Sequence, residues 1–104
     1  MSKRKAPVAV LLERSVYEIY CRLGEQDSFR KAIDKGLEAL KENMFAGDMI
    51  KKSQIPKYYI SKFGVTNLYR LKLDRERRCS YTIVADREGL KVVVLEVFAD
   101  HKSY

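Results

Sequence analysis

Residues 68–73 and 77–84 alternate apolar and polar side chains, the pattern of β-strands that bury one face. A largely apolar run over residues 90–98 follows them. Short charged stretches, residues 74–77 and 86–89, separate the three runs and predict tight hairpin loops. The second stretch ends on Gly89, which is free to take a positive φ. The last third of the chain therefore predicts three consecutive antiparallel strands.

Alternation also predicts which side chains share a face of the sheet. The buried face of the first two strands is expected to hold Tyr69, Leu71, Leu73, Cys79, Tyr81 and Ile83. The opposite, exposed face is expected to hold three cations and two hydroxyls: Arg70, Lys72, Arg78, Ser80 and Thr82. In the third strand, Val93, Leu95 and Val97 form one wholly apolar set. The other set contains Glu96, which is expected to share the face of Arg70 and Arg78. Such a surface suits a phosphate backbone.

The first half of the chain predicts one strand and two helices. Residues 8–12 form a short apolar run, and apolar residues then recur at helical spacing from Val16 to Leu23, before Gly24. Asp27 or Ser28 is suited to cap a second helix. Its apolar stripe consists of Phe29, Ala32, Ile33, Gly36, Leu37 and Leu40. The two helices are joined by only a few residues, which favours antiparallel neighbours packed on the sheet.

A third, short helix is predicted between Pro56 and Gly64. It mixes lysines with aromatic residues, among them Tyr58 and Tyr59. Such a mixture is consistent with stacking on nucleic-acid bases and equally with ordinary packing. The whole chain, residues 1–104, is then a single α+β domain. We expect an antiparallel sheet of about four strands, covered on one face by an N-terminal helical hairpin in the order β-α-α-β-β-β.

The net charge of +7 is distributed unevenly along the chain. Residues 1–50 hold nine basic and eight acidic side chains, whereas residues 51–104 hold twelve basic and six acidic ones. The excess lies in the predicted sheet and favours an anionic partner, nucleic acid first. Cys21 and Cys79 are isolated and are expected in the core, and with one histidine they argue against a zinc site. No run approaches the length of a membrane span, so a cytoplasmic protein without membrane contact is expected.

The element order, the basic sheet face and the C-terminal tail together resemble the RelE/ParE toxin superfamily. The matching pieces are residues 68–73, residues 78–81 with an Arg three residues before a Tyr, residues 92–97, and the closing pair His101 and Tyr104. In residues, the resemblance is specific only over about 68–104, while the element order matches over nearly the whole chain. It implies a metal-free endoribonuclease of a toxin–antitoxin system, an mRNA interferase that needs no cofactor.

The resemblance also implies roles for individual residues. Messenger RNA would be cut, alone or on the ribosome, by attack of the ribose 2′-hydroxyl on the adjacent phosphate. Arg78 would hold the scissile phosphate, with Arg70 and Lys72 beside it. Tyr104 would orient or deprotonate the nucleophile, and His101 would protonate the leaving oxygen. Apart from the resemblance, Glu96 on the same sheet face is an alternative base to Tyr104. Arg77 and Lys102 are further phosphate-binding candidates. A cognate antitoxin is the expected protein partner, and a homodimer is a further candidate assembly.

Two alternatives belong to different functional classes. A non-catalytic relative of the ParE branch would inhibit DNA gyrase and would lack the ribonuclease residues. A basic nucleic-acid-binding module, suggested only by the charge of the second half, would bind RNA or DNA in a salt-sensitive way without cutting it.

Overall fold

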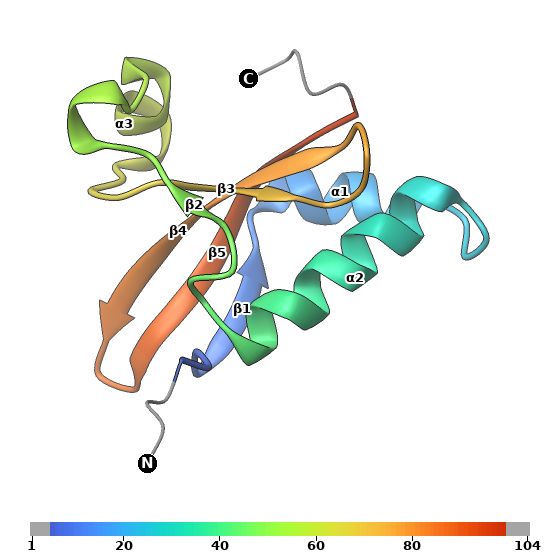
Figure 1. The fold of residues 1–104 in the computed structure, drawn as a ribbon, viewed down its shortest axis with the longest axis horizontal. Helices are drawn as coiled ribbons and strands as arrows, with labels where there is room; N and C mark the ends of the chain where they lie inside the picture. Colours follow the sequence, from blue (N-terminus) through green and yellow to red (C-terminus); the bar gives the residue numbers. More distant parts are fainter. Residues whose placement is uncertain (1–4, 100–104) are drawn as a thin grey trace.

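The computed structural model describes residues 5–99 and confirms the α+β class, with helices packed on both faces of one sheet (Figure 1). The strands are β1 (Ala9–Leu12), β2 (Asp48–Met49), β3 (Tyr69–Lys72), β4 (Arg78–Asp86) and β5 (Gly89–Phe98). The helices are α1 (Arg14–Arg22), α2 (Ser28–Glu42), the 3-10 turn η1 (Lys52–Gln54) and α3 (Lys57–Phe63). The elements therefore follow the predicted order, with α3 before the three-strand meander.

The sheet has five strands in the order β1-β5-β4-β3-β2, where about four antiparallel strands were expected. The structure confirms the predicted class and order, and it adds two details to the sheet. The first strand, β1, lies at the edge of the sheet next to β5 and runs parallel to it. The short strand β2, which the sequence did not predict, pairs antiparallel with β3 over two residues. The sheet is consequently mixed but mostly antiparallel.

The helix boundaries follow from local side-chain chemistry. The Glu13 carboxylate accepts a hydrogen bond from the Ser15 N–H at the start of α1, and the Asp27 carboxylate accepts one from the Phe29 N–H at the start of α2. The α3 helix begins after Pro56 and ends at Gly64, whose φ of 65° is left-handed. These four boundaries agree with the predicted ones to within two residues.

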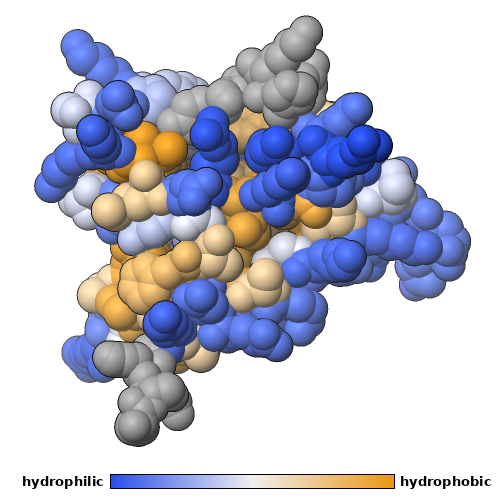
Figure 2. Space-filling model, viewed as in Figure 1, coloured by the Kyte–Doolittle hydropathy of each residue, from blue (hydrophilic) through white to orange (hydrophobic). Residues whose placement is uncertain are grey.

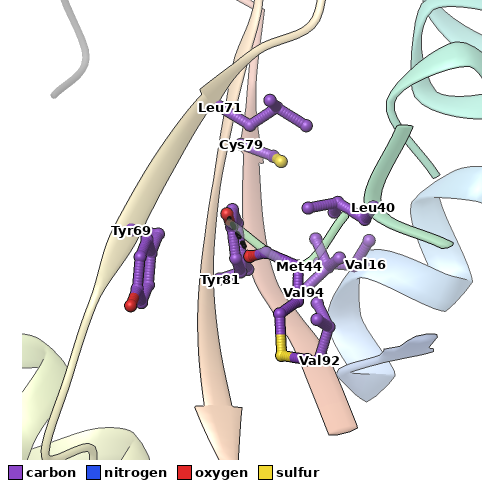
Figure 3. Close-up of a cluster of buried hydrophobic side chains, with 9 residues drawn as sticks. All are labelled: Val16, Leu40, Met44, Tyr69, Leu71, Cys79, Tyr81, Val92 and Val94. Atoms are coloured by element: carbon purple, nitrogen blue, oxygen red, sulfur yellow. Dashed lines mark hydrogen bonds between the residues drawn. The ribbon is translucent and has the colours of Figure 1, made fainter. Parts of the chain in front are cut away.

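The main core lies between the sheet and the helices α1 and α2 (Figure 3). It contains Val16, Leu40, Met44, Tyr69, Leu71, Cys79, Tyr81, Val92 and Val94. The hydroxyl of the buried Tyr81 donates to the Met44 carbonyl at 2.8 Å and accepts from the Gly47 N–H at 3.0 Å. Tyr81 thereby ties the chain after α2 to the centre of the sheet. Cys21, expected in the core, is instead exposed on α1.

A second, smaller core lies on the opposite face of the sheet, under α3. It contains Ile55, Tyr59, Val65, Leu68 and Leu95, with Ile50, Phe63 and Val93 packed against it. Ser80 and Thr82, which the alternation predicts on an exposed face, are buried in the structure. The reason is that this second layer covers their part of the sheet. Around Arg70, Lys72 and Arg78 this face is not covered by the second layer, and these side chains are half-buried or exposed.

A β-bulge shifts the register between β4 and β5. Ser80 lies opposite Glu96, whereas Tyr81 lies opposite Val94, so Leu95 is an extra residue. The predicted grouping of Val93, Leu95 and Val97 was therefore wrong. Val97 packs against the main core, while Val93 and Leu95 pack under α3. Across residues 5–99, no helix combines the length and apolar character needed to cross a bilayer.

Candidate nucleic-acid interface

Strand register brings most of the predicted basic residues together on the α3 face of the sheet. Arg70 lies opposite Ser80, which lies opposite Glu96. In the adjacent row, Lys72 lies opposite Arg78. Side chains directly opposite each other stand about 5 Å apart at Cβ, and diagonal neighbours about 7 Å. Arg70, Lys72, Arg78 and Glu96 therefore form one contiguous group, which we call the polar face.

The guanidinium of Arg78 turns toward the hairpin loop between β3 and β4. Its Nη1 donates to the carbonyl oxygens of Asp74 at 3.0 Å, Arg77 at 3.1 Å and Arg75 at 3.4 Å. These acceptors are neutral, and no carboxylate in the described part of the chain forms an ion pair with Arg78. The loop thus fixes the side chain while leaving its positive charge uncompensated, which suits an anion-binding group.

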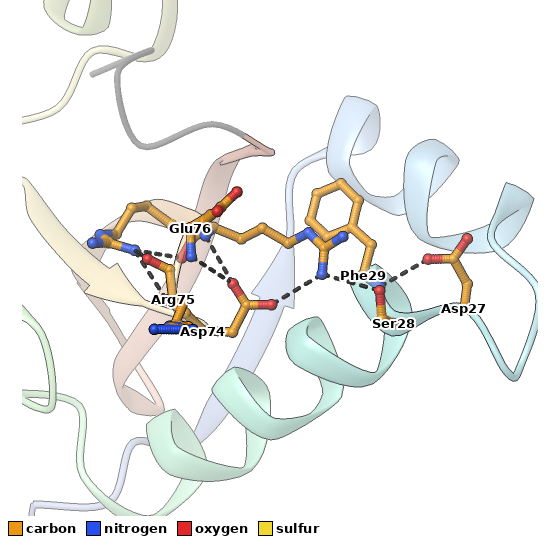
Figure 4. A network of polar contacts seen from close by, with 8 residues as sticks. Asp27, Ser28, Phe29, Asp74, Arg75 and Glu76 are labelled. Atoms are coloured by element: carbon orange, nitrogen blue, oxygen red, sulfur yellow. Dashed lines mark hydrogen bonds and ion pairs between the residues drawn. The ribbon is translucent and has the colours of Figure 1, made fainter.

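Arg77, also predicted to bind phosphate, belongs to the other face. Its Nη1 lies 2.9 Å from the Asp74 carboxylate and 3.2 Å from the Ser28 hydroxyl, and its guanidinium lies 5.0 Å above the Phe29 ring. Figure 4 shows the loop residues meeting the start of α2. Arg77 is therefore held in a structural contact between the loop and α2, and the structure does not bring it into the polar face.

The Asp74 carboxylate organises this loop. Burial acts to raise its pKa, but hydrogen bonds from the N–H groups of Arg77 and Glu76, together with the Arg77 guanidinium, outweigh that effect and lower the pKa below its ordinary value. Asp74 stays ionised and paired with Arg77. Asp74 therefore neutralises Arg77, whereas the adjacent Arg78 bonds only to backbone carbonyl groups. Figure 2 shows strongly hydrophilic side chains gathered near the end of the molecule that holds this loop.

The remaining cations of the polar face differ in exposure. Lys72 is exposed and forms no ion pair with any residue in the 5–99 range. Arg70 is half-buried, and Asp48 of β2 lies opposite it on its other side. Lys72, which is exposed, and Arg78, which has no carboxylate partner among the described residues, are therefore the cations best placed for an incoming phosphate, with Arg70 in the adjacent row.

Glu96 is bound by side chains of α3 that the sequence did not predict in this role. The Tyr59 hydroxyl lies 2.9 Å from Glu96 Oε1 and 3.1 Å from the Ser80 hydroxyl. The Tyr58 hydroxyl donates to Glu96 Oε2, and the Lys62 ammonium donates to the Tyr58 hydroxyl at 3.3 Å. Tyr59 is buried, as packing requires, while Tyr58 is exposed. The spacing of Tyr58 and Lys62, one helical turn apart, was the available signal.

The predicted tail residues His101, Lys102 and Tyr104 lie outside the described residues, so their roles stay predictions. The last strand, β5, ends at Phe98, directly opposite Arg78. The chain therefore leaves the sheet beside the polar face.

An apolar groove of about 570 Å³ lies elsewhere, lined mainly by residues of the α3–β3 connection and the second half of β4. None of the predicted site residues lines it. Within residues 5–99, no three His, Cys, Asp or Glu side chains are grouped as metal ligands would be.

Comparison with known proteins gives no further identification: no family model, curated protein or solved structure matches the chain. Any functional conclusion therefore depends on the residues themselves. The polar face combines cations that can hold a phosphate with a carboxylate and two phenols that can accept or donate protons.

Proposed function

We propose that the protein is a RelE-like endoribonuclease that cuts messenger RNA by attack of the ribose 2′-hydroxyl on the adjacent phosphate. The observation that carries this proposal is the polar face, where Arg78 keeps an uncompensated charge beside Lys72 and Arg70. An Arg fork matches the geometry of a phosphate, and positive charge at the phosphate is the main requirement of phosphodiester cleavage.

In this mechanism the cations of the polar face bind the phosphate, and its carboxylate takes part in proton transfer. Arg78 and Lys72 bind the non-bridging oxygens of the scissile phosphate and stabilise the negative charge that builds up there. Glu96 lies in the row next to Arg78 and takes part in removing the proton from the 2′-hydroxyl. His101 and Tyr104, attached beyond the end of β5, remain the proposed acid and the proposed second proton acceptor.

The substrate is RNA, free or on the ribosome, and the protein acts in the cytoplasm. An antitoxin partner and a homodimer remain part of the proposal and rest on the resemblance alone.

The second candidate is a protein of the same architecture that binds nucleic acid, or inhibits DNA gyrase, without cutting RNA. The bonds that Arg78 makes to its own loop, and the two tyrosines on Glu96, favour this reading, because both groups already have protein partners. The two candidates differ in one observable, the appearance of new RNA ends.

The test is cleavage of a defined transcript by the purified chain, alone and with translating ribosomes, with 5′ ends mapped. We expect cuts by the parent, and a fall of about 100-fold or more in rate for Arg78→Ala, the usual cost of removing one group that stabilises transition-state charge. Arg78→Lys, which keeps the charge without the fork, should retain part of the rate.

Arg87→Ala is the matched control, because Arg87 is exposed at the opposite end of β4, in the turn before β5. It should cut at the parental rate. Thermal unfolding is measured for each variant, because a lower Tm would show that the change disturbs the β3–β4 loop as well as removing the charge. Intact RNA under both conditions, from a folded parent chain, would exclude the ribonuclease. Inhibition of gyrase supercoiling or salt-sensitive RNA binding by that same chain would then identify the non-catalytic alternative.

A further inference from the structure

The contacts between α3 and β5 form a chain of proton donors and acceptors that ends at an exposed phenol. Lys62 donates to the Tyr58 hydroxyl, and Tyr58 donates to Glu96 Oε2. Tyr59, from the same helix, fixes the other carboxylate oxygen of Glu96. In a core these groups would be fully enclosed, but Tyr58 is 48% exposed while Tyr59 is 3% exposed. The buried phenol therefore positions the carboxylate, and the exposed phenol is the one a ligand can reach.

We propose that Tyr58 is the general base of the ribonuclease reaction, acting as a relay that passes the 2′-hydroxyl proton to Glu96. This inference rests on the proposed function. It assigns to α3 a catalytic residue that lies before residues 68–104, where the sequence pattern placed the site.

The hydrogen-bonding capacity of a phenol supports this assignment. A tyrosine hydroxyl has one donor and two acceptor positions. The donor is directed at Glu96 and one acceptor position receives Lys62, which leaves one acceptor position on the exposed side for the 2′-hydroxyl. The hydrogen bond to Tyr58 raises the pKa of Lys62, so the ammonium persists and can stabilise negative charge that develops on the phenol oxygen.

The step balances with one proton donor for the leaving oxygen and no other reactant besides the RNA. The 2′-hydroxyl proton moves to the Tyr58 oxygen as the Tyr58 proton moves to Glu96 Oε2. The 2′-oxygen forms a bond to phosphorus, and the bond between phosphorus and the 5′-oxygen breaks. The departing 5′-oxygen takes a proton from the acid of the proposed function or from water, leaving a 2′,3′-cyclic phosphate and a 5′-hydroxyl end. The protonated Glu96 then returns its proton to solvent.

The Tyr58–Glu96 pair also lies close enough to the cations to act on a phosphate that they bind. Glu96 is in the same row as Arg70, and Arg78 is its diagonal neighbour in the next row. A phosphate held by Arg78 and Lys72 therefore lies within about one nucleotide of the Tyr58–Glu96 pair. Because the same helix packs on Leu95 through Tyr59, the phenol is mounted on the sheet that carries the cations.

The experiment is single-turnover cleavage by Tyr58→Phe, which keeps the ring and removes only the hydroxyl. It is run under whichever condition, alone or on ribosomes, supports cleavage by the parent. We expect a rate about 100-fold below the parental one, with RNA affinity changed less than about two-fold. Tyr17→Phe is the control, since Tyr17 is exposed to a similar extent on α1, which packs on the other face of the sheet. It should cut like the parent.

Two further measurements separate a catalytic role from a structural one. The Glu96→Gln side chain still accepts a hydrogen bond but takes no proton, so its cleavage rate should also fall about 100-fold. The double variant Tyr58→Phe/Glu96→Gln should then cut only slightly more slowly than either single variant. A substrate with a 5′-bridging sulfur has a leaving group that needs no acid. If Tyr58 is the base, this substrate does not restore the rate of Tyr58→Phe; restoration would make Tyr58 the acid and overturn the proposal.

The outcomes distinguish failure of the relay from failure of the ribonuclease. If Arg78→Ala loses cleavage while Tyr58→Phe keeps it within about three-fold, the ribonuclease stands and the relay is wrong. If the parent cuts no RNA under either condition, both are wrong.

Discussion

Replacing Tyr81 with Phe should destabilise this fold far more than the loss of one oxygen atom suggests. The Tyr81 side chain has no exposed surface, and its hydroxyl serves two backbone groups, the Met44 carbonyl and the Gly47 N–H. Phenylalanine keeps the ring and its packing, so no cavity of consequence forms. The change isolates the two hydrogen bonds that join Tyr81 in β4 to the connection between α2 and β2.

The magnitude follows from what the deletion leaves behind. The Met44 carbonyl is buried and would lose its tyrosine partner at a cost of about 1–3 kcal/mol, while the part-buried Gly47 N–H adds about 1 kcal/mol. A loss of about 2–4 kcal/mol is a large share of the roughly 5–15 kcal/mol typical of a domain this size. It corresponds to a fall of about 10–20 °C in Tm.

The assay is urea unfolding followed by circular dichroism, comparing Tyr81→Phe with Tyr17→Phe, whose phenol is 57% exposed. We expect a lower midpoint at unchanged m-value for the first variant and no change above about 0.5 kcal/mol for the second. If Tyr81→Phe costs less than about 1 kcal/mol, then water or backbone relaxation satisfies both groups, and the account of Tyr81 as the tie between the chain after α2 and the centre of the sheet is refuted.

Two other predictions concern buried polar groups of the sheet. Burial raises the pKa of Cys79 from 9.0 to about 12 and that of Tyr81 from 10.0 to about 12. The unfolded chain therefore releases these protons first, and stability that is complete below pH 9 should fall as pH rises toward 12, by about 3 kcal/mol between pH 9 and 11. Urea midpoints across this range test it, and Cys79→Ala should remove the part of the decline that begins near pH 9. Asn67 extends the β3 ladder with its side chain, which accepts from the Ile83 N–H at 2.8 Å and donates to the Ile83 carbonyl at 2.9 Å. Asn67→Ala should cost about 2–3 kcal/mol and speed hydrogen exchange at the Ile83 amide, whereas unchanged exchange there would show that the ladder does not need it.

The parts of the fold that were predictable are those decided by local chemistry. The α2 cap at Asp27, the α3 helix between Pro56 and Gly64, and the turn with Gly89 at a φ of 128° each need only neighbouring residues. Strand pairing was harder to predict from the sequence. Nothing local tells that β1 lies parallel to β5, or that two residues near Asp48 join the sheet, because both depend on contacts between distant segments.

The candidate site shows the same division. Alternation correctly groups Arg70, Lys72 and Arg78 on one face, since β3 and β4 pair without irregularity over these residues. It also separates Arg77 from them, and this placement was available from the sequence, where Arg77 and Arg78 are adjacent and must point to opposite faces. What alternation cannot show is the partner of each charge. The Asp74 carboxylate neutralises Arg77, while Arg78 meets only carbonyl groups of the same loop.

The β-bulge in β5 explains why α3 became part of the site. In a regular strand Leu95 and Glu96 would point to opposite faces, and only one of them could meet α3. The extra residue lets both point to the same face. Leu95 then packs with Tyr59 in the second core, and Glu96 receives the hydroxyls of Tyr58 and Tyr59. One irregularity in the ladder thus supplies both the apolar contact that fixes α3 and the polar contact that joins it to the cations. Deleting Leu95 should therefore restore alternation and rotate one of these two contacts away from α3, and a single-residue deletion that left both intact would contradict this role of the bulge.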